Sequence, residues 1–373
     1  MKRFGLLLLC MCLFLSACGT APEETQPSTQ ATTQTPTTET TVATTAPTTE
    51  ATTEATTEAT TEVLNYRHPL TGEWLAEPMC NRPVAVVVNN ISDSQPFHGV
   101  GSADILCEHV VEGGGTITRL LAVFSDLETA GKIGSIRSAR TYMIDLARNF
   151  NAPLVHCGGS SYADQEISRS KYPDFDQFDY PAYFYRDKDR LDAGYSSEHT
   201  MMTDGEDLLK GLNDNNFTMT VEADANYGMN FSDEVVLNGE SAKKITMQFY
   251  SSSGKRTIMT YDEEKDVYFG SQKWKTKQAA MLDGNTGEEL SFRNVLILKL
   301  KTTTNGTHMF STMTGEGKGY YAYGGKYVPI IWHRESVTDS FVYTLEDGTP
   351  LTLAAGKTYI GLLASKGPEV IFE

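Results

Sequence analysis

The apolar residues in the first half of the chain fall into short, nearly uninterrupted runs. One run covers Val84–Val88, a second covers 117–124, and a third covers 153–157 and ends at Gly158-Gly159. Continuous apolar runs of this length are typical of strands that are buried on both faces of a sheet. The pattern therefore predicts three buried strands.

Segments with helical spacing separate and follow these runs. Residues 142–149 carry apolar side chains three and four positions apart, and a second helix is expected over 160–168 with a serine in the capping position. The sequence Thr203–Glu206 has the form of a capping box in front of a helix at 207–212. Strands that alternate with helices indicate an α/β domain with a mixed sheet and flanking helices.

From about residue 221 the pattern changes to short alternating segments separated by turns. Gly324-Gly325 and Asp347-Gly348 each separate two strand-like runs, so each predicts a β-hairpin, the first with a type I′ or II′ turn. Further strands are expected at 245–249, 257–261, 267–269 and 294–302. This half is therefore expected to be a mainly β domain. We place the α/β domain at 64–220 and the mainly β domain at 221–373.

The first 18 residues have the pattern of a secretory signal. Lys2 and Arg3 precede an apolar run, and Leu15-Ser16-Ala17-Cys18 follows it. This ending resembles the bacterial lipobox, in which the cysteine receives a diacylglycerol and the signal is cut before it. The resemblance implies a signal peptide at 1–17 and lipidation of Cys18. The apolar run is shorter than the ~20 residues of a spanning helix.

Residues 18–63 comprise the lipidated cysteine and a segment of a different composition. Threonine, glutamate, alanine and proline dominate, and Ala-Thr-Thr-Glu occurs three times in succession at 51–62. A segment with so little apolar surface cannot offset the entropy lost on ordering. We therefore expect a disordered stalk that holds the folded part at the outer face of the bacterial cytoplasmic membrane.

Charge and cysteine content narrow the functional classes. The chain has a net charge of −17; the signal and stalk hold two basic and seven acidic residues, so 64–373 is near −12. This charge argues against nucleic acid as a partner. Cys80, Cys107 and Cys157 remain in the folded part, either as one disulfide and one thiol or as small buried side chains. No metal-ligand spacing or cofactor motif is found, so no cofactor is expected.

Several segments together resemble the YerB-like bacterial lipoproteins, a family of unknown function. The resemblance extends in order through nearly all of 64–373 and rests on Arg82–Val86, Val111–Gly114, Thr118–Phe124, Ile133–Arg140, His156–Ser160, Gly325–Trp332 and Gly356–Ile360. It implies a two-domain protein that is lipid-anchored outside the cytoplasm, and it brings no established chemistry. Glu198-His199-Thr200 departs from the Pro-His-Asn-like stretch expected at this point.

Three arginines are the best candidates for ligand binding. Arg119 lies at the start of an apolar run, and Arg137 and Arg140 bracket Ser138-Ala139 just before the predicted helix. If Ser138 caps that helix, free backbone N–H groups lie beside two guanidinium groups, which is a favourable arrangement for an anion. The alternative is that each arginine pairs with one of the many carboxylates of the domain.

Glu112 and His156 are the candidates for acid–base chemistry. Asp104, Glu108 and Glu112 recur every four residues, but the neighbouring valines favour a strand, in which carboxylates about 13 Å apart cannot act as a pair. Glu112 is then expected to face Arg119 or Arg140. His156 lies at a strand end, where a general base or a buried structural histidine are both possible.

These observations leave three functional classes open. The leading hypothesis is a lipid-anchored protein that binds an anionic ligand of the cell envelope through Arg119, Arg137, Ser138 and Arg140. The second is a hydrolase or phosphotransferase that acts on cell-wall glycan or a phosphate-linked polymer, with Glu112 or His156 as base. The third is a scaffold for other envelope proteins. The sequence does not decide whether the protein is an enzyme.

Overall fold

The computed structural model describes residues 64–111, 117–249, 254–274 and 277–373, which belong to one compact unit that begins at Thr60. The predicted signal peptide, Cys18 and the stalk lie outside the described residues. Within the described ranges, every helix is too short or too polar to cross a membrane.

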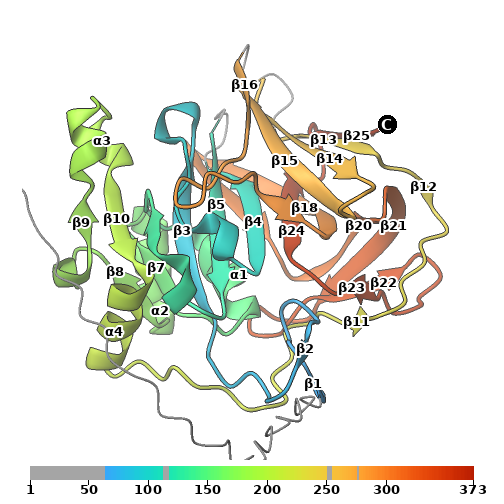
Figure 1. Ribbon diagram of the computed structural model, residues 1–373, viewed down its shortest axis with the longest axis horizontal. Coiled ribbons are helices and arrows are strands. Elements are labelled where there is room, and N and C mark those ends of the chain that lie inside the picture. Colours follow the sequence, from blue (N-terminus) through green and yellow to red (C-terminus); the bar gives the residue numbers. More distant parts are fainter. Residues whose placement is uncertain (1–63, 112–116, 250–253, 275–276) are drawn as a thin grey trace, which may run out of the picture. The chain divides into compact units, whose positions relative to one another are not determined.

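A mixed sheet of twelve strands crosses the whole unit and contains strands from both halves of the sequence (Figure 1). From the first half it takes β3 (Val84–Asn90), β4 (Ile105–Val110), β5 (Thr118–Phe124), β7 (Leu154–His156) and β8 (Asp174–Asp176). From the second half it takes β12 (Glu240–Ser241), β18 (Asn294–Asn305), β19 (His308–Thr312), β20 (Gly315–Tyr323), β21 (Lys326–Arg334), β22 (Val342–Leu345) and β24 (Thr358–Ala364).

The two halves meet where β24 runs parallel to β4. Thr358 to Leu362 of β24 align with Ile105 to His109 of β4, and β24 also runs parallel to β18 on its other side. The path across the sheet is β12-β21-β20-β18-β24-β4-β5-β3-β7-β8, with β19 on β18 and β22 on β21. Backbone hydrogen bonds therefore continue without a break across the predicted boundary near residue 220, whose position as a domain boundary stays a prediction.

Each face of this sheet has its own core, as the continuous apolar runs predicted. Val84, Val86 and Val88 of β3 pack into one core, while Ala85 and Val87 pack into the other. Helix α1 (Thr141–Asn149) packs in the second core. The first core is covered in part by a six-stranded antiparallel sheet of β13 (Lys244–Gln248), β14 (Arg256–Asp262), β15 (Val267–Trp274), β16 (Lys277–Ala280), β17 (Ser291–Phe292) and β25 (Glu369–Phe372).

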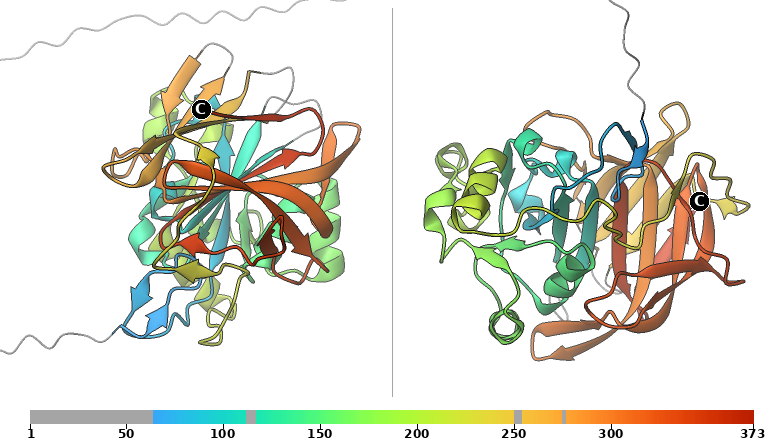
Figure 2. Two further views of the ribbon diagram at one scale, coloured as in Figure 1. Left: turned by 90° about the vertical axis from the view of Figure 1, so that its right-hand side faces the viewer. Right: turned by 90° about the horizontal axis from the view of Figure 1, so that it is seen from below.

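The remaining helices lie on the side of β7 and β8 (Figures 1 and 2). They are α2 (Ser161–Ser170), α3 (Lys188–Asp192) and α4 (Gly205–Asp214), and Tyr162 of α2 also contacts β19 of the second half. A three-stranded sheet lies with them and consists of β6 (Lys132–Gly134), β9 (Tyr185–Arg186) and β10 (Met201–Asp204). Two further pairs are β1 (Tyr66–Arg67) with β2 (Trp74–Leu75) and β11 (Phe231–Ser232) with β23 (Leu353–Ala354). Short 3-10 helices occur at Ser92–Ser94, Val100–Ser102, Glu128–Ala130, Pro181–Tyr183 and Ser197–His199.

The structure confirms the predicted fold class: a mixed sheet with helices in the first half and mostly β structure in the second. The Gly324-Gly325 hairpin is present, and both glycines have positive φ (59° and 72°), as a type I′ turn requires. The prediction of a capping box at Thr203–Glu206 is wrong. Asp204 is the N-cap residue of α4 and makes no side-chain capping bond, while the hydroxyl of Thr203 donates to the Tyr183 carbonyl oxygen.

Candidate functional site

Buried polar side chains gather at one edge of the central sheet. Strands β3, β7 and β8 run parallel, and β3 and β4 are both antiparallel to β5, so their carboxyl ends and the start of β5 meet at the same edge. Asn89, His109, Arg119 and His156 lie there and are all buried. In open α/β sheets, ligands bind beyond the carboxyl ends of the strands. This edge therefore holds the candidate functional site.

Arg119 lies in the interior of this edge. Its backbone is aligned with Asn89 of β3 on one side and His109 of β4 on the other, and its side chain is only 7% exposed. Its Nη1 donates a hydrogen bond of 2.5 Å to the carbonyl oxygen of Ser138. The sheet edge is thereby joined to the segment that carries the other two arginines.

Residues 135–140 cross the sheet edge between β3 and β7. The N–H of Asn89 donates to the Ser135 carbonyl, the N–H of Arg137 donates to the Val87 carbonyl, and the N–H of Cys157 donates to the Arg137 carbonyl. These backbone bonds insert the segment beside β3, beyond the short stretch in which β3 pairs with β7. The three predicted arginines therefore belong to one edge of the sheet.

Arg137 points toward the 3-10 helix at Ser197–His199. Its Nη1 donates to the Glu198 carbonyl oxygen at 2.9 Å, and its Nη2 lies 3.2 Å from the Glu198 carboxylate. The side chain of Asn89 donates to Nδ1 of the adjacent His199 at 3.0 Å. Burial lowers the pKa of His199. Glu198 and His199 were not predicted as site residues, although their stretch departs from the family pattern.

Ser138 does not cap helix α1, contrary to the prediction. The N-cap residue is Arg140, which makes no side-chain capping bond. The Nη1 of Arg140 donates to the Ala139 carbonyl at 2.9 Å. The contribution of Ser138 to this edge is its carbonyl oxygen, which accepts from Arg119. Guanidinium groups therefore lie beside the start of α1 without the serine cap.

Both ring nitrogens of His156 are engaged. Nδ1 lies 2.9 Å from the Gly158 carbonyl oxygen, which can only accept, and Nε2 lies 3.1 Å from the Asp174 carboxylate. Burial opposes protonation, but the hydrogen bond to Asp174 and the charge of Asp176 outweigh it, and the pKa of His156 is raised. When both ring nitrogens donate, the ring has no free lone pair with which to accept a proton. The role of His156 as a general base stays a prediction that this geometry does not favour.

Glu112 lies outside the described residues, so its predicted contact with Arg119 or Arg140 stays a prediction. The strand predicted for its neighbours is confirmed, because Glu108 lies within β4. Asp104 directly precedes β4 and accepts from the N–H of Ser125. The carboxylates at 104 and 108 thus have separate partners.

Glu108 is fully buried and forms the centre of a polar network that the sequence did not predict. Its Oε1 lies 3.2 Å from the Lys255 ammonium and accepts from Asn90 and Thr118, while its Oε2 accepts from Thr257 and Tyr359. Lys255 is also buried, and this burial lowers its pKa. No spacing in the sequence relates these residues.

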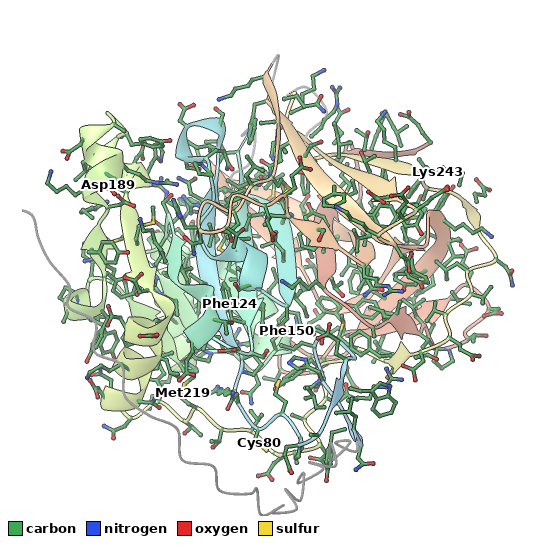
Figure 3. The ribbon with its side chains drawn as sticks, in the orientation of Figure 1. Cys80, Phe124, Phe150, Asp189, Met219 and Lys243 are labelled. Carbon is green, nitrogen blue, oxygen red and sulfur yellow. The ribbon has the colours of Figure 1, made fainter. Side chains whose placement is uncertain are left out.

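The described cysteines and acidic residues form neither a disulfide nor a metal site. Cys80, Cys107 and Cys157 are free thiols. Cys107 is buried as predicted, but Cys80 is exposed at the periphery of the structure (Figure 3) and Cys157 is half-buried. Within the described ranges, no group of three or more histidine, cysteine, aspartate or glutamate side chains is arranged to hold a metal ion.

Two family models together match most of the folded part of the chain. Residues 70–218 match the N-terminal domain of a family described as "Protein of unknown function (DUF3048)", and residues 245–360 match its C-terminal domain. The sequence is 25% identical over 306 residues to a protein of Bacillus subtilis (strain 168) named "Putative lipoprotein YerB". This match covers 79% of the chain and 85% of YerB.

A crystal structure of YerB from Bacillus subtilis has the same fold. The TM-score is 0.70 at 23% sequence identity, and the match covers 82% of this chain and 100% of the YerB chain. Both halves of the sequence are therefore matched in order, by sequence and by structure. The chain belongs to the DUF3048 family of proteins of unknown function and is similar to YerB.

Proposed function

We propose that this protein is a lipoprotein, anchored through Cys18 at the outer face of the bacterial cytoplasmic membrane, that binds an anionic ligand of the cell envelope. The ligand site comprises Arg119, Arg137, Ser138 and Arg140. The observation that carries the proposal is the hydrogen bond from Arg119 to the Ser138 carbonyl, because it joins the guanidinium of β5 to the segment of the other two arginines.

The anchor is supported by two independent observations. The sequence Leu15-Ser16-Ala17-Cys18 follows a short basic and apolar segment, as lipoprotein processing requires. The relative from Bacillus subtilis carries the name "Putative lipoprotein YerB". Two or more acyl chains hold a protein at a membrane firmly, whereas one chain binds reversibly.

The choice of an anion follows from the chemistry of the site. Guanidinium groups bind carboxylate and phosphate groups through parallel charged hydrogen bonds. The start of α1 adds backbone N–H groups and the positive end of the helix dipole beside Arg140. Arg137 is partly exposed, and its ion pair is with Glu198, whose side chain is more than half exposed. A pair of this kind is weak in water, so an anionic ligand can compete for Arg137.

Phosphate binding by the full-length protein in detergent micelles tests the ligand site. Calorimetric titration with inorganic phosphate should give a dissociation constant that Arg137→Gln and Arg140→Gln each weaken by about 10- to 150-fold, the equivalent of a charged hydrogen bond of about 1.5–3 kcal/mol. Arg256→Gln, on β14, is the matched control and should bind as the wild type does. Unchanged phosphate affinity in both variants at the site would refute it.

The anchor is tested separately by fractionating cells that express the Cys18→Ala variant. The variant should leave the membrane fraction or remain uncut, because its signal no longer ends in an acceptor for lipid. A Cys18→Ala chain that is cut after Ala17 and still sediments with membranes would contradict the anchor while leaving the ligand site open.

A further inference from the structure

A serine and a histidine from distant parts of the sequence are hydrogen-bonded at the same edge of the sheet. The Oγ of Ser311 on β19 lies 2.6 Å from Nε2 of His109 on β4. The Nδ1 of His109 lies 2.6 Å from the carbonyl oxygen of Leu362 on β24. A carbonyl oxygen can only accept, so Nδ1 carries a proton and, in the neutral ring, Nε2 has the lone pair that accepts from the Ser311 hydroxyl.

We propose that Ser311 is the nucleophile, and His109 the general base, of a second site that hydrolyses carboxylic esters. The Leu362 carbonyl holds the imidazole in the required tautomer, the place that a carboxylate takes in the Ser-His-Asp triad. The arrangement meets the geometric test for an activated nucleophile, a hydroxyl within hydrogen-bond reach of a base that a third group orients. Neither Ser311 nor His109 belongs to the ligand site proposed above, although His109 is aligned with Arg119 across β4 and β5.

The serine is accessible while the histidine is not. His109 is buried among the sheet strands with its ring edge-on to Tyr142 of α1 at 4.6 Å, whereas Ser311 is half-buried. Ser311 lines a groove of about 450 Å³ between α1, α2 and β19. Thr141, Tyr162 and Phe310 are among the other lining residues. A volume of this size accommodates a small substrate.

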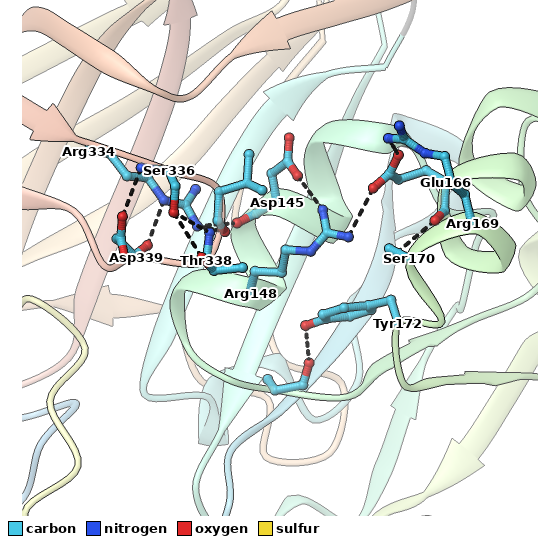
Figure 4. Close-up of polar contacts among 12 residues, drawn as sticks. Asp145, Arg148, Glu166, Arg169, Ser170, Tyr172, Arg334, Ser336, Thr338 and Asp339 are labelled. Atoms are coloured by element: carbon cyan, nitrogen blue, oxygen red, sulfur yellow. Dashed lines mark hydrogen bonds and ion pairs between the residues drawn. The ribbon is translucent and has the colours of Figure 1, made fainter.

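The groove has a polar wall and an aromatic wall. On the polar side Arg148 donates to both Asp145 and Glu166 (Figure 4), so these charges hold one another in place. On the aromatic side the rings of Tyr162 and Phe310 meet edge to face at 5.0 Å. This combination suits an acyl group or the apolar face of a sugar next to polar hydroxyl groups.

The strength of the base restricts the substrate class. Burial lowers the pKa of His109 to about 4, against the weaker opposing effects of the Leu362 hydrogen bond and the Glu108 charge. The ring is therefore neutral and ready to accept a proton at pH 7, but it is a weak base, and no carboxylate among the described residues bonds to it. Esters have a better leaving group than amides, so esters are the class that such a base can serve.

Each step of the reaction balances with water as the co-reactant. The Ser311 oxygen bonds to the ester carbonyl carbon while its proton passes to Nε2 of His109. The bond from that carbon to the alcohol oxygen then breaks, and the alcohol takes the proton from Nε2. Water next attacks the acyl-serine and gives one proton to Nε2, which returns it to the Ser311 oxygen as the carboxylic acid leaves.

Covalent labelling of the full-length protein with an alkyl fluorophosphonate tests the nucleophile. The expected result is a single adduct on Ser311, found by peptide mass spectrometry, with loss of at least about ten-fold in labelling rate for His109→Gln. Thr302→Val is the matched control because Thr302 is the cross-strand neighbour of Ser311 and carries a hydroxyl outside the dyad. It should label as the wild type does.

The pH dependence provides a second readout that needs no variant. The groups around His109 are Glu108 beside it on β4, Arg119 opposite on β5, Tyr142 on α1 and Ser311 on β19. With a base of pKa about 4 the labelling rate should be level between pH 5.5 and 8. A histidine of ordinary pKa would lose about ten-fold over the lower part of that range.

Two results would overturn the proposal. One is labelling of Ser311→Ala at the wild-type rate, which places the reactive group elsewhere. The other is no labelling of the wild-type protein under conditions that label a known serine hydrolase, which makes the contact between Ser311 and His109 structural. Hydrolysis of 4-nitrophenyl butyrate, lost in Ser311→Ala and kept in Thr302→Val, would extend the result from reactivity to turnover.

Discussion

The pKa of His156 depends on the groups that surround its ring. It ends β7, and its ring lies between the Gly158 carbonyl and the Asp174 carboxylate, with the Asp176 carboxylate 3.9 Å away. His109 lies on β4, three strands across the sheet from β7. Within the described residues its ring makes no hydrogen bond to a carboxylate, and its pKa is lowered to about 4. The pKa values of the two histidines are thus shifted in opposite directions, although both residues lie near strand ends.

We expect the contribution of His156 to stability to depend on pH. Its pKa is raised in the folded protein, so the stabilisation is complete below the unfolded value of about 6.5 and is lost as the pH rises through the folded pKa. Urea denaturation of wild type and His156→Gln should show a stability difference that shrinks between pH 6 and pH 9. The exposed His333→Gln variant is the control, and an equal shrinkage there would contradict the assignment.

At the scale of single elements, two serines that were both predicted to cap a helix differ in the structure. Ser160 is the N-cap of α2, and its hydroxyl oxygen accepts from the Ala163 N–H at 3.2 Å. Ser138 lies before α1 but leaves the N-cap position to Arg140. The difference arises because backbone bonds hold residues 135–137 to β3 and hold Ala139 to Gly158 and Ser160, so α1 can begin only afterwards.

Alanine substitution should separate these serines. Ser160→Ala is expected to cost about 0.5–2 kcal/mol of unfolding free energy, the usual value of a side-chain N-cap, since the Ala163 N–H loses its acceptor. Ser138→Ala should change the unfolding free energy by less than about 0.5 kcal/mol, because only its carbonyl is used. Urea denaturation measures both, and equal costs would show that the two helices share a capping mode.

At the scale of the whole molecule, the pair Glu108 and Lys255 joins the two layers of sheet. Glu108 lies on β4 of the twelve-stranded sheet, and Lys255 directly precedes β14 of the six-stranded sheet. Tyr359 of β24 donates to the same carboxylate. The buried Glu108 carboxylate thus contacts strands from both halves of the sequence. The apolar core between the two sheets is a second link between them.

Removing one partner of this pair should destabilise the entire unit. Glu108→Gln leaves the Lys255 ammonium buried without a counter-charge, and a loss of about 3–5 kcal/mol is expected. The double variant Glu108→Gln with Lys255→Met should recover part of that loss. Glu373→Gln, which breaks an exposed pair with Lys244, is the control and should cost less than about 1 kcal/mol.

A single cooperative urea transition for both halves would accompany this result. If Glu108→Gln instead unfolds with the wild-type midpoint, the buried pair does not hold the layers together. The exposed-pair control makes that outcome interpretable, because it measures what a carboxylate-to-amide change costs when water replaces the partner.

Local patterns in the sequence predicted much of the fold and the positions of the three arginines at the edge of the sheet. The continuous apolar run at Val84–Val88 predicted a strand buried on both faces, and Gly324-Gly325 predicted the hairpin turn. Such signals are readable because side-chain periodicity and positive φ depend on a few adjacent residues. The placement of Arg119 at a strand start and of Arg137 and Arg140 before a helix followed from the same local rules.

Only the tertiary structure decided which distant residues meet. Nothing in the sequence relates Glu108 to Lys255, or His109 to Ser311 and Leu362, because their contacts require β24 to lie beside β4 and β19 to extend from β18. The capping box at Thr203 was wrong for the same reason: Thr203 belongs to β10, and its hydroxyl bonds to Tyr183. The sequence determines local conformation because that depends on neighbouring residues. The pairing of strands far apart in the chain determines which buried charges pair, as in Glu108 with Lys255, and which hydroxyl lies beside which histidine, as in Ser311 with His109.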